Sequence, residues 1–259
     1  MNILFIGDVV GRPGREALED RLTPLRAELD ASVCIVNGEN VADGVGITPK
    51  LAERLLAAGA DAITLGNHTW RRQEIAPYLA ASDRVIRPAN LPESGPGKGV
   101  TVVPALDGTL VGIVNVMGSL SLQPARSMWE IVDELVDELR ETTPVILVDV
   151  HAEATSEKIA LAQWLDGRVT AVVGTHTHVQ TADARVQPGG TAAITDVGMT
   201  GPHDSVIGVK TPQAVQRMVT GMPVRFETAE GDVRIEGVFV ECDPSGRATS
   251  CELVRVSVP

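Results

Sequence analysis

The segment VVGTHTH, residues 172–178, places two histidines directly after a short apolar run. Such a run is typical of a buried strand. In an extended backbone residues two apart face the same side, so we expect His176 and His178 to serve one metal cluster together. Amidohydrolase barrels also use His-x-His, but usually from their first strand. Here the pair lies about two-thirds of the way along the chain, which counts against that fold.

Four other apolar runs end on side chains of a similar kind. They are NILFIGDVVG (2–11) with Asp8, VCIVNGEN (33–40) with Glu39 and Asn40, TLGNHTW (64–70) with Asn67 and His68, and ILVDVHAE (146–153) with His151. An open α/β sheet gathers its ligands at the ends of its strands, so we expect these side chains to converge. With His68 set aside, three imidazoles, two carboxylates and two amides exceed the needs of one tetrahedral zinc. They suit two cations that share a bridge, an arrangement used for hydrolysis at phosphorus.

Taken singly, these segments have structural alternatives. Asp8 could cap a helix or form an Asx turn. The glycines around it, Gly7, Gly11 and Gly14, lack the GxGxxG spacing of a dinucleotide loop, and Pro13 interrupts them. The NGEN segment could equally be a hydrogen-bonded loop. The recurrence of ligand-type residues at five strand ends therefore carries the prediction.

His68 has a different expected role, because it directly follows Asn67. An asparagine amide oxygen can bind a metal, which would put the adjacent imidazole beside the site rather than in it. Imidazole is a common proton donor near neutral pH. A lone histidine at a strand end is more often structural, so this role depends on the other residues converging.

Residues outside the cluster have expected supporting roles. Asp149 and Glu153 flank His151 in sequence and could orient the metal ligands. Specificity is expected from two loops, Asn115–Ser119 and Asp196–Gly201.

Four other residues stand out by type. Trp70 is expected either to wall the pocket or to pack in the core, and Trp129 and Trp164 to pack in the core. His203, in the loop GPHDSVIG, has no assigned role.

Composition limits the class of protein. The 259 residues, 44% of them hydrophobic, suffice for a sizeable core. A net charge of −12 opposes a long nucleic-acid footprint, although bound cations would still attract small anions. The three cysteines are widely spaced and lack a CxxC pair, which predicts reduced thiols in a cytoplasmic protein. We expect no membrane association, because no apolar run approaches the ~20 residues needed to span a bilayer.

Apolar runs alternate with amphipathic segments along most of the chain. The predicted strands are Ile3–Ile6, Val33–Val36, Ala62–Leu65, Val111–Val116, Val145–Val150, Val169–Val173 and Ala192–Thr195. The predicted helices are Gly14–Leu29, Pro49–Ala58, Arg71–Ala80, Met128–Arg140, Lys158–Leu165 and Pro212–Thr220. This alternation predicts a sheet with covering helices. After Gly221 the pattern changes to alternating runs with polar turns, typical of an antiparallel meander. We expect a single α/β domain over residues 1–259 with an antiparallel C-terminal part.

Read in order, these motifs resemble the calcineurin-like metallophosphoesterase superfamily. There are two departures: the first motif normally reads Asp-x-His where this chain has Asp8-Val9-Val10, and Glu39 replaces an aspartate. These departures, with strings such as GDVVGRPGR, NGENVADGVGIT, LGNHTW and GTHTHVQTAD, resemble the bacterial YmdB-like branch. The resemblance extends to about residue 210 and implies a four-layer α/β/β/α sandwich.

The resemblance also implies roles for individual residues and a binuclear metal centre. One metal would be held by Asp8, Glu39, Asn40 and His178, and the other by Glu39, Asn67, His151 and His176. Glu39 would bridge the two, Asn40 would stand in for the missing histidine of the first motif, and His68 would be the general acid. Iron is the expected metal, with manganese as the alternative. No cofactor besides these ions is expected.

The implied activity is a phosphodiesterase that hydrolyses cyclic nucleotides or similar small phosphodiesters. A metal-bound hydroxide would attack phosphorus, and His68 would protonate the departing alkoxide. A homo-oligomer is compatible with the sequence. Two alternatives stay open: a phosphomonoesterase such as a nucleotidase, and a metal-binding regulatory protein in which catalysis is incidental.

Overall fold

The apolar runs form the centres of two β-sheets in the computed structural model, which describes residues 1–258. The first sheet has the order β2-β12-β13-β1-β3-β4-β5, with β14 paired to β13. Its strands are β1 (Asn2–Ile6), β2 (Asp8–Val9), β3 (Val33–Asn37), β4 (Ala62–Thr64), β5 (Val85–Ile86), β12 (Met199–Pro202), β13 (Val233–Cys242) and β14 (Ala248–Ser257). Strand β1 runs parallel to β3 and antiparallel to β13, so this sheet is mixed.

The second sheet has the order β10-β11-β9-β8-β7-β6. Its strands are β6 (Val100–Pro104), β7 (Leu110–Met117), β8 (Ile146–His151), β9 (Ala171–Thr175), β10 (Arg185–Val186) and β11 (Ala192–Ile194). The four inner strands are parallel, and an antiparallel strand closes each edge.

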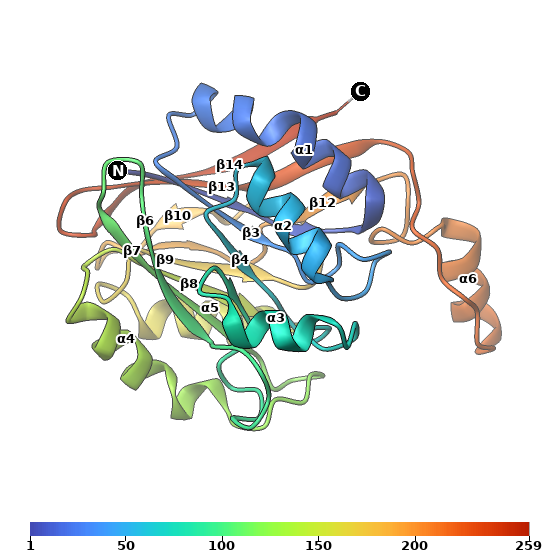
Figure 1. The fold of residues 1–259 in the computed structure, drawn as a ribbon, viewed down its shortest axis with the longest axis horizontal. Coiled ribbons are helices and arrows are strands. Elements are labelled where there is room, and N and C mark those ends of the chain that lie inside the picture. The colour runs from blue at the N-terminus through green and yellow to red at the C-terminus, as the bar shows by residue number, and fades with distance from the viewer. Residues whose placement is uncertain (259) are drawn as a thin grey trace.

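Helices cover the outer face of each sheet (Figure 1). They are α1 (Gly11–Glu28), α2 (Pro49–Ala58), α3 (Ile75–Ala81), α4 (Val132–Arg140), α5 (Thr155–Trp164) and α6 (Thr211–Thr220), with a 3₁₀ turn, η1, at Met128–Glu130. One apolar core joins α1, α2 and α3 to the first sheet, another joins α4 and α5 to the second, and a third lies between the sheets. The expected four-layer α/β/β/α sandwich is confirmed. Helix α6 projects from the body (Figure 1).

All the predicted strands and helices are present, although their bounds shift. Strand bounds move by at most two residues, whereas α3 begins only at Ile75, after bends and turns at residues 71–74, and α4 only at Val132, after the 3₁₀ turn η1. Thr48 caps α2 as expected, accepting a hydrogen bond from Leu51 N at 3.3 Å, with Pro49 in the first turn. Five short strands, β2, β5, β6, β10 and β12, were not predicted.

The antiparallel C-terminal part is confirmed, but it is a hairpin of β13 and β14 rather than a longer meander. Residues 223–229, expected to be the first of the alternating runs, make only an isolated bridge between Val209 and Thr228. They pair with the chain before α6 instead of joining a sheet.

The expectation that Trp129 and Trp164 lie in the core is wrong. Both are exposed, by 42% and 56%, and their rings pack edge to face at 6.4 Å on the surface. Indole rings can cover each other in this way because their edges and faces carry opposite partial charge. Among residues 1–258 no helix is long and apolar enough to cross a membrane.

Candidate metal centre

All eight predicted site residues come together where strands from both sheets end. Asp8 follows β1, Glu39 and Asn40 lie in the turn after β3, and Asn67 and His68 follow β4. The second sheet contributes His151, the last residue of β8, with His176 and His178 from the loop after β9. The opposed sheets thus supply the two sides of one site.

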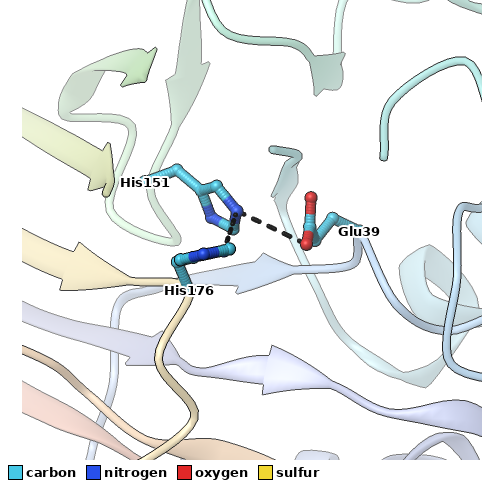
Figure 2. Close-up of side chains that lie close together, drawn as sticks. All are labelled: Glu39, His151 and His176. Carbon is cyan, nitrogen blue, oxygen red and sulfur yellow. Dashed lines mark hydrogen bonds and ion pairs between the residues drawn. The ribbon is translucent and has the colours of Figure 1, made fainter. Parts of the chain in front are cut away.

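One group of these side chains gathers around His151 (Figure 2). His151 Nε2 lies 2.9 Å from Asn67 Oδ1, 3.1 Å from His176 Nδ1 and 3.4 Å from Glu39 Oε1. Glu39, His151 and His176 each offer a ligand atom, and these three atoms lie within 4.8 Å of one another. This is the spacing of groups that could hold a metal ion.

A second group of side chains includes Asp8, Asn40 and His178. His178 Nε2 lies 3.1 Å from Asn40 Nδ2 and 3.8 Å from Asp8 Oδ1, and Asn40 Nδ2 donates to Glu39 Oε1 at 3.0 Å. Asp8 and Glu39 are fully buried. Glu39 therefore contacts both groups, as a bridging residue would.

The two histidines of GTHTH reach the site by a different path from the one expected. Strand β9 ends at Thr175, and His176 and His178 have positive φ angles of 98° and 66°, so the backbone is not extended there. Thr177 between them donates from its N and its Oγ1 to Asp196 Oδ2, at 3.1 and 2.8 Å. A tight turn, not strand alternation, places both imidazoles.

The anchor of this turn is a buried ion pair that the sequence analysis did not find. Lys158 Nζ, from α5, donates to Asp196 Oδ2 at 2.7 Å, and both side chains are only 1% exposed. The second oxygen of Asp196 accepts from Gly198 N at 2.9 Å. Asp196 was expected to serve in a specificity loop, and nothing in the sequence pairs it with Lys158.

Asp149 and Glu153 support the histidines, as expected. His151 Nδ1 lies 2.9 Å from Thr175 Oγ1, which donates to Asp149 Oδ1 at 2.7 Å. His176 Nε2 lies 3.1 Å from Glu153 Oε2. Contacts of this kind fix the ring orientation of a ligand histidine. Thr175 was overlooked, although it stands inside GTHTH.

His68 lies beside the two groups. Its Nδ1 is 2.9 Å from Asn40 Oδ1 and 3.1 Å from Glu39 Oε1, and its backbone N donates to Glu39 Oε2 at 3.1 Å. The ring also lines the adjacent cavity, which leaves Nε2 as the nitrogen on the cavity side. This is the geometry of a positioned proton donor.

Burial and close charges set the protonation of the site. Burial would raise the pKa of Glu39, but His151 and His68 outweigh it and hold that pKa well below its usual value. Burial would lower the pKa of His151, yet Glu39 outweighs it and raises the pKa to about 9. Burial and then His151 lower the pKa of His176 to about 3. A cation would have to displace the proton of His151, because imidazole binds metals in its neutral form.

The donor set fits metal ions. Burial raises the pKa of Asp8, and its Oδ1 is buried without a hydrogen-bond partner in residues 1–258. Such an orphaned oxygen is costly unless something binds it. Carboxylate, amide and imidazole groups are suitable ligands for first-row transition metals.

A cavity of about 310 Å³ opens beside the site. Its walls come from residues 43–45, 207–209 and 226–228, together with Val10 and the site residues Glu39, Asn40, His68, His176 and His178. The expected specificity loops, Asn115–Ser119 and Asp196–Gly201, contribute nothing to it. Asn115 is buried and hydrogen-bonds the backbone of Leu65 and Asp149, and Asp196 anchors the histidine turn.

Trp70 and His203 also lie away from this cavity. Trp70 packs against the core under α1 to α3, with the Arg87 guanidinium 5.7 Å from its ring centre. His203 Nδ1 faces Gly201 O at 3.0 Å, and its Nε2 lies 3.3 Å from Glu236. The packing alternative for Trp70 is therefore correct, and His203 is no part of the cluster.

Solved structures share this architecture over its whole length. A hypothetical protein from Thermus thermophilus superposes with a TM-score of 0.93 at 40% identity, covering 100% of both chains. A novel phosphatase from Mycoplasma pneumoniae superposes with a TM-score of 0.92 at 35% identity, covering 99% of this chain and 93% of the other. The fold and the clustered side chains define an enzyme of the metallophosphoesterase type.

Sequence comparison narrows the class to one family. Residues 4–254 match the model of YmdB-like proteins. A Bacillus subtilis (strain 168) relative named 2′,3′-cyclic-nucleotide 2′-phosphodiesterase is 49% identical over 243 residues, covering 94% of this chain and 92% of the relative. The chain belongs to the YmdB-like protein family.

Proposed function

We propose that this protein hydrolyses cyclic nucleotides or similar small phosphodiesters with the aid of two metal ions. The observation that supports it best is the pair of ligand groups sharing Glu39, with His68 held beside them at hydrogen-bond distance. The Bacillus subtilis relative carries the name of such an activity.

The proposed ligands follow the two groups of side chains. Asp8, Glu39, Asn40 and His178 would hold one ion, and Glu39, Asn67, His151 and His176 the other. The Asn40 amide now turns Nδ2 toward Glu39 and His178, so it would rotate by half a turn to offer its oxygen. Iron is the proposed metal and manganese the alternative, both compatible with mixed nitrogen and oxygen ligands.

When bound, the ions would activate a water molecule and polarise the phosphoryl oxygens. His68 would then give a proton from Nε2 to the departing ribose oxygen, which is a poor leaving group without it. Its Nδ1 would stay fixed by Glu39, whose carboxylate stabilises the charged ring, because the Asn40 oxygen that it now contacts would turn to the metal. Asp149, through Thr175, and Glu153 would hold His151 and His176 in place.

The charge of the site favours a diester over a monoester, which carries nearly one more negative charge. Within the described chain, no lysine or arginine side chain is among the residues that line the cavity. Lys158 pairs with Asp196, and Arg12 and Arg72 pair with surface carboxylates.

We further propose a cytoplasmic location, because all three cysteines, which lie within the described residues, are free thiols.

A substrate comparison tests the proposal. At matched metal loading, kcat/KM should be higher for 2′,3′-cyclic and 3′,5′-cyclic nucleotides than for the corresponding nucleoside monophosphates. A clear preference for monophosphates would replace the proposal with a nucleotidase. Failure to cleave either class would leave the regulatory alternative.

The metal part has its own test. Glu39→Ala should abolish activity and lower the metal content, since both ions lose a ligand. His203→Ala is the control and should retain metal, because the ring nitrogens face Gly201 and Glu236 and not the site. Full activity in Glu39→Ala, or in thoroughly chelated protein, would refute the two-metal proposal.

A further inference from the structure

The cavity beside the site has two chemically different ends. Part of its lining, here called the inner end, consists of His68, His178 and the other site residues, and the rest, here called the outer end, includes the apolar side chains of Val45, Ile207 and Phe226. A phosphodiester bound at the inner end would have to extend one of its substituents along the outer end. A volume of about 310 Å³ is at the lower end of the range of small-molecule sites, enough for one compact group.

The outer wall is a flap made of the two chain segments that carry α6. Lys210 N donates to Glu227 O at 3.0 Å, Ala229 N donates to Gly208 O at 2.9 Å, and Val209 bridges Thr228. The base of the flap is tightly seated, because a methyl group on Gly11 would come within 2.7 Å of the Thr228 side chain. The flap is thus held in a defined position against the body.

One hydrogen bond joins the flap directly to the metal ligands. His178 Nδ1 lies 2.9 Å from Ile207 O, while its Nε2 faces Asn40 and Asp8. This bond therefore fixes the position of the apolar wall relative to the inner end of the cavity, where the phosphate would bind.

Phe226 is the aromatic ring of this wall. The Arg217 guanidinium, from α6, stands 5.3 Å from its ring centre, and the ring is still 43% exposed. An aromatic face in such a position can stack on a flat ligand group.

The charges of the outer end limit what that group can be. The charged residues there are Asp43 and Glu227, both acidic, and no cation from residues 1–258 lines the cavity. Asp43 pairs with Arg72 and Glu227 with Lys210, so within the described residues the lining offers no unpaired cation for a second phosphate or an oligonucleotide backbone. A flat, uncharged group suits both the apolar surface and this charge.

We propose that the outer end of the cavity binds the nucleobase of a mononucleotide cyclic phosphodiester, and that Phe226 determines this preference by stacking on the base. The inference rests on the proposed function. It adds the place where the base binds and the residue that favours substrates with a base.

A matched pair of substrates tests this preference: adenosine 2′,3′-cyclic phosphate, and methyl ribofuranoside 2′,3′-cyclic phosphate, in which a methyl group replaces the base. The wild-type protein should prefer the first in kcat/KM. Phe226→Ala should lower this preference by about tenfold to a hundredfold, the range expected for one base–aromatic stack, mainly through KM. Phe226→Trp should keep it, and Met222→Ala, an exposed residue outside the cavity, should leave both substrates unaffected.

A binding measurement separates recognition from catalysis. Adenosine, which has no phosphate, should show saturation transfer to its base protons from chelated wild-type protein, and much less from chelated Phe226→Ala. Equal losses on both substrates, or no loss on either, would overturn the inference, as would a wild-type protein indifferent to the base. Wild-type protein that cleaves neither substrate would instead refute the proposed function itself.

Discussion

At the scale of single residues, His68 is the group whose role is easiest to test. It should act in proton transfer, since its Nδ1 is fixed by Asn40 and Glu39 while its ring faces the cavity. His68→Ala should slow turnover of ribose-type esters by roughly 10²–10⁴, the usual contribution of a general acid. The loss should shrink with p-nitrophenyl esters, whose leaving group needs little protonation.

Metal content must be measured on the same preparations. His68→Ala should retain its ions, because the proposed ligands lie on other side chains. Equal losses on both kinds of ester would indicate that His68 orients the substrate, and loss of metal that it binds an ion.

Gly66 illustrates how closely the site is packed. A Cβ atom at this position would lie 2.3 Å from both Glu39 Oε2 and His151 Nε2, so Gly66→Ala must displace both side chains or its own backbone. We expect metal content and activity to fall sharply.

Gly221→Ala is the control: its φ of 68° makes the change strained, but a Cβ there meets nothing within 4 Å. It should cost stability, by about 1 kcal/mol, without loss of metal, measured by elemental analysis and thermal unfolding. A fully metal-loaded Gly66→Ala protein would show that the site can relax around the methyl group.

At the scale of elements, the sequence best predicted the strands whose burial on both faces produces a run of apolar residues. Strands β3, β8 and β9 are continuous apolar runs because both of their faces are covered, and their ends could be predicted from where the run stops. The meeting of eight side chains at the ends of these strands and of β1 and β4 followed from the rule for strand ends in open sheets.

Other features left no readable pattern. The turn at His176 and His178 depends on Asp196, a contact distant in sequence, so strand alternation was the wrong guide there. The flap is held by backbone hydrogen bonds between residues 207–210 and 226–229, and such bonds do not constrain side-chain type. The specificity loops were misplaced for this reason.

The buried pair of Lys158 and Asp196 should stabilise the histidine turn. Lys158→Met would leave the Asp196 carboxylate buried without its cation, and breaking such a pair typically costs about 3–5 kcal/mol. The measurement is the free energy of unfolding in urea, together with metal affinity. Lys210→Met is the matched control, since Lys210 pairs with Glu227 at the exposed surface, and it should change stability far less. Comparable losses in both variants would contradict a special role for the buried pair.

At the scale of the whole molecule, the two sheets share one apolar core, so we expect them to unfold together. That core contains side chains of both, such as Phe5 and Ile35 from the first sheet and Ile113 and Leu147 from the second. Residues 1–259 would then behave as the single domain predicted from the sequence. In chelated protein, calorimetry should give one transition with equal calorimetric and van't Hoff enthalpies. Two separable transitions would indicate two folding units.

The metal site should also contribute to the stability of the whole molecule, because its ligands join both sheets. Asp8, Glu39 and Asn67 follow strands of the first sheet, and His151 and His176 belong to the second. An ion bound only by the folded state stabilises it by about 2.7 kcal/mol at a hundred times its Kd. For a chain of this size that is roughly 5–10 °C in melting temperature.

Chelation should therefore lower the melting temperature as well as abolish activity, and adding iron or manganese should restore both. Glu39→Ala separates stabilisation by ions bound at this site from a non-specific effect of the ions on melting temperature, because it removes the ligand that both ions would share. Its melting temperature should barely respond to added metal. A wild-type protein that melts at the same temperature with and without metal would mean that the ions do not hold the sheets together, whatever their part in catalysis.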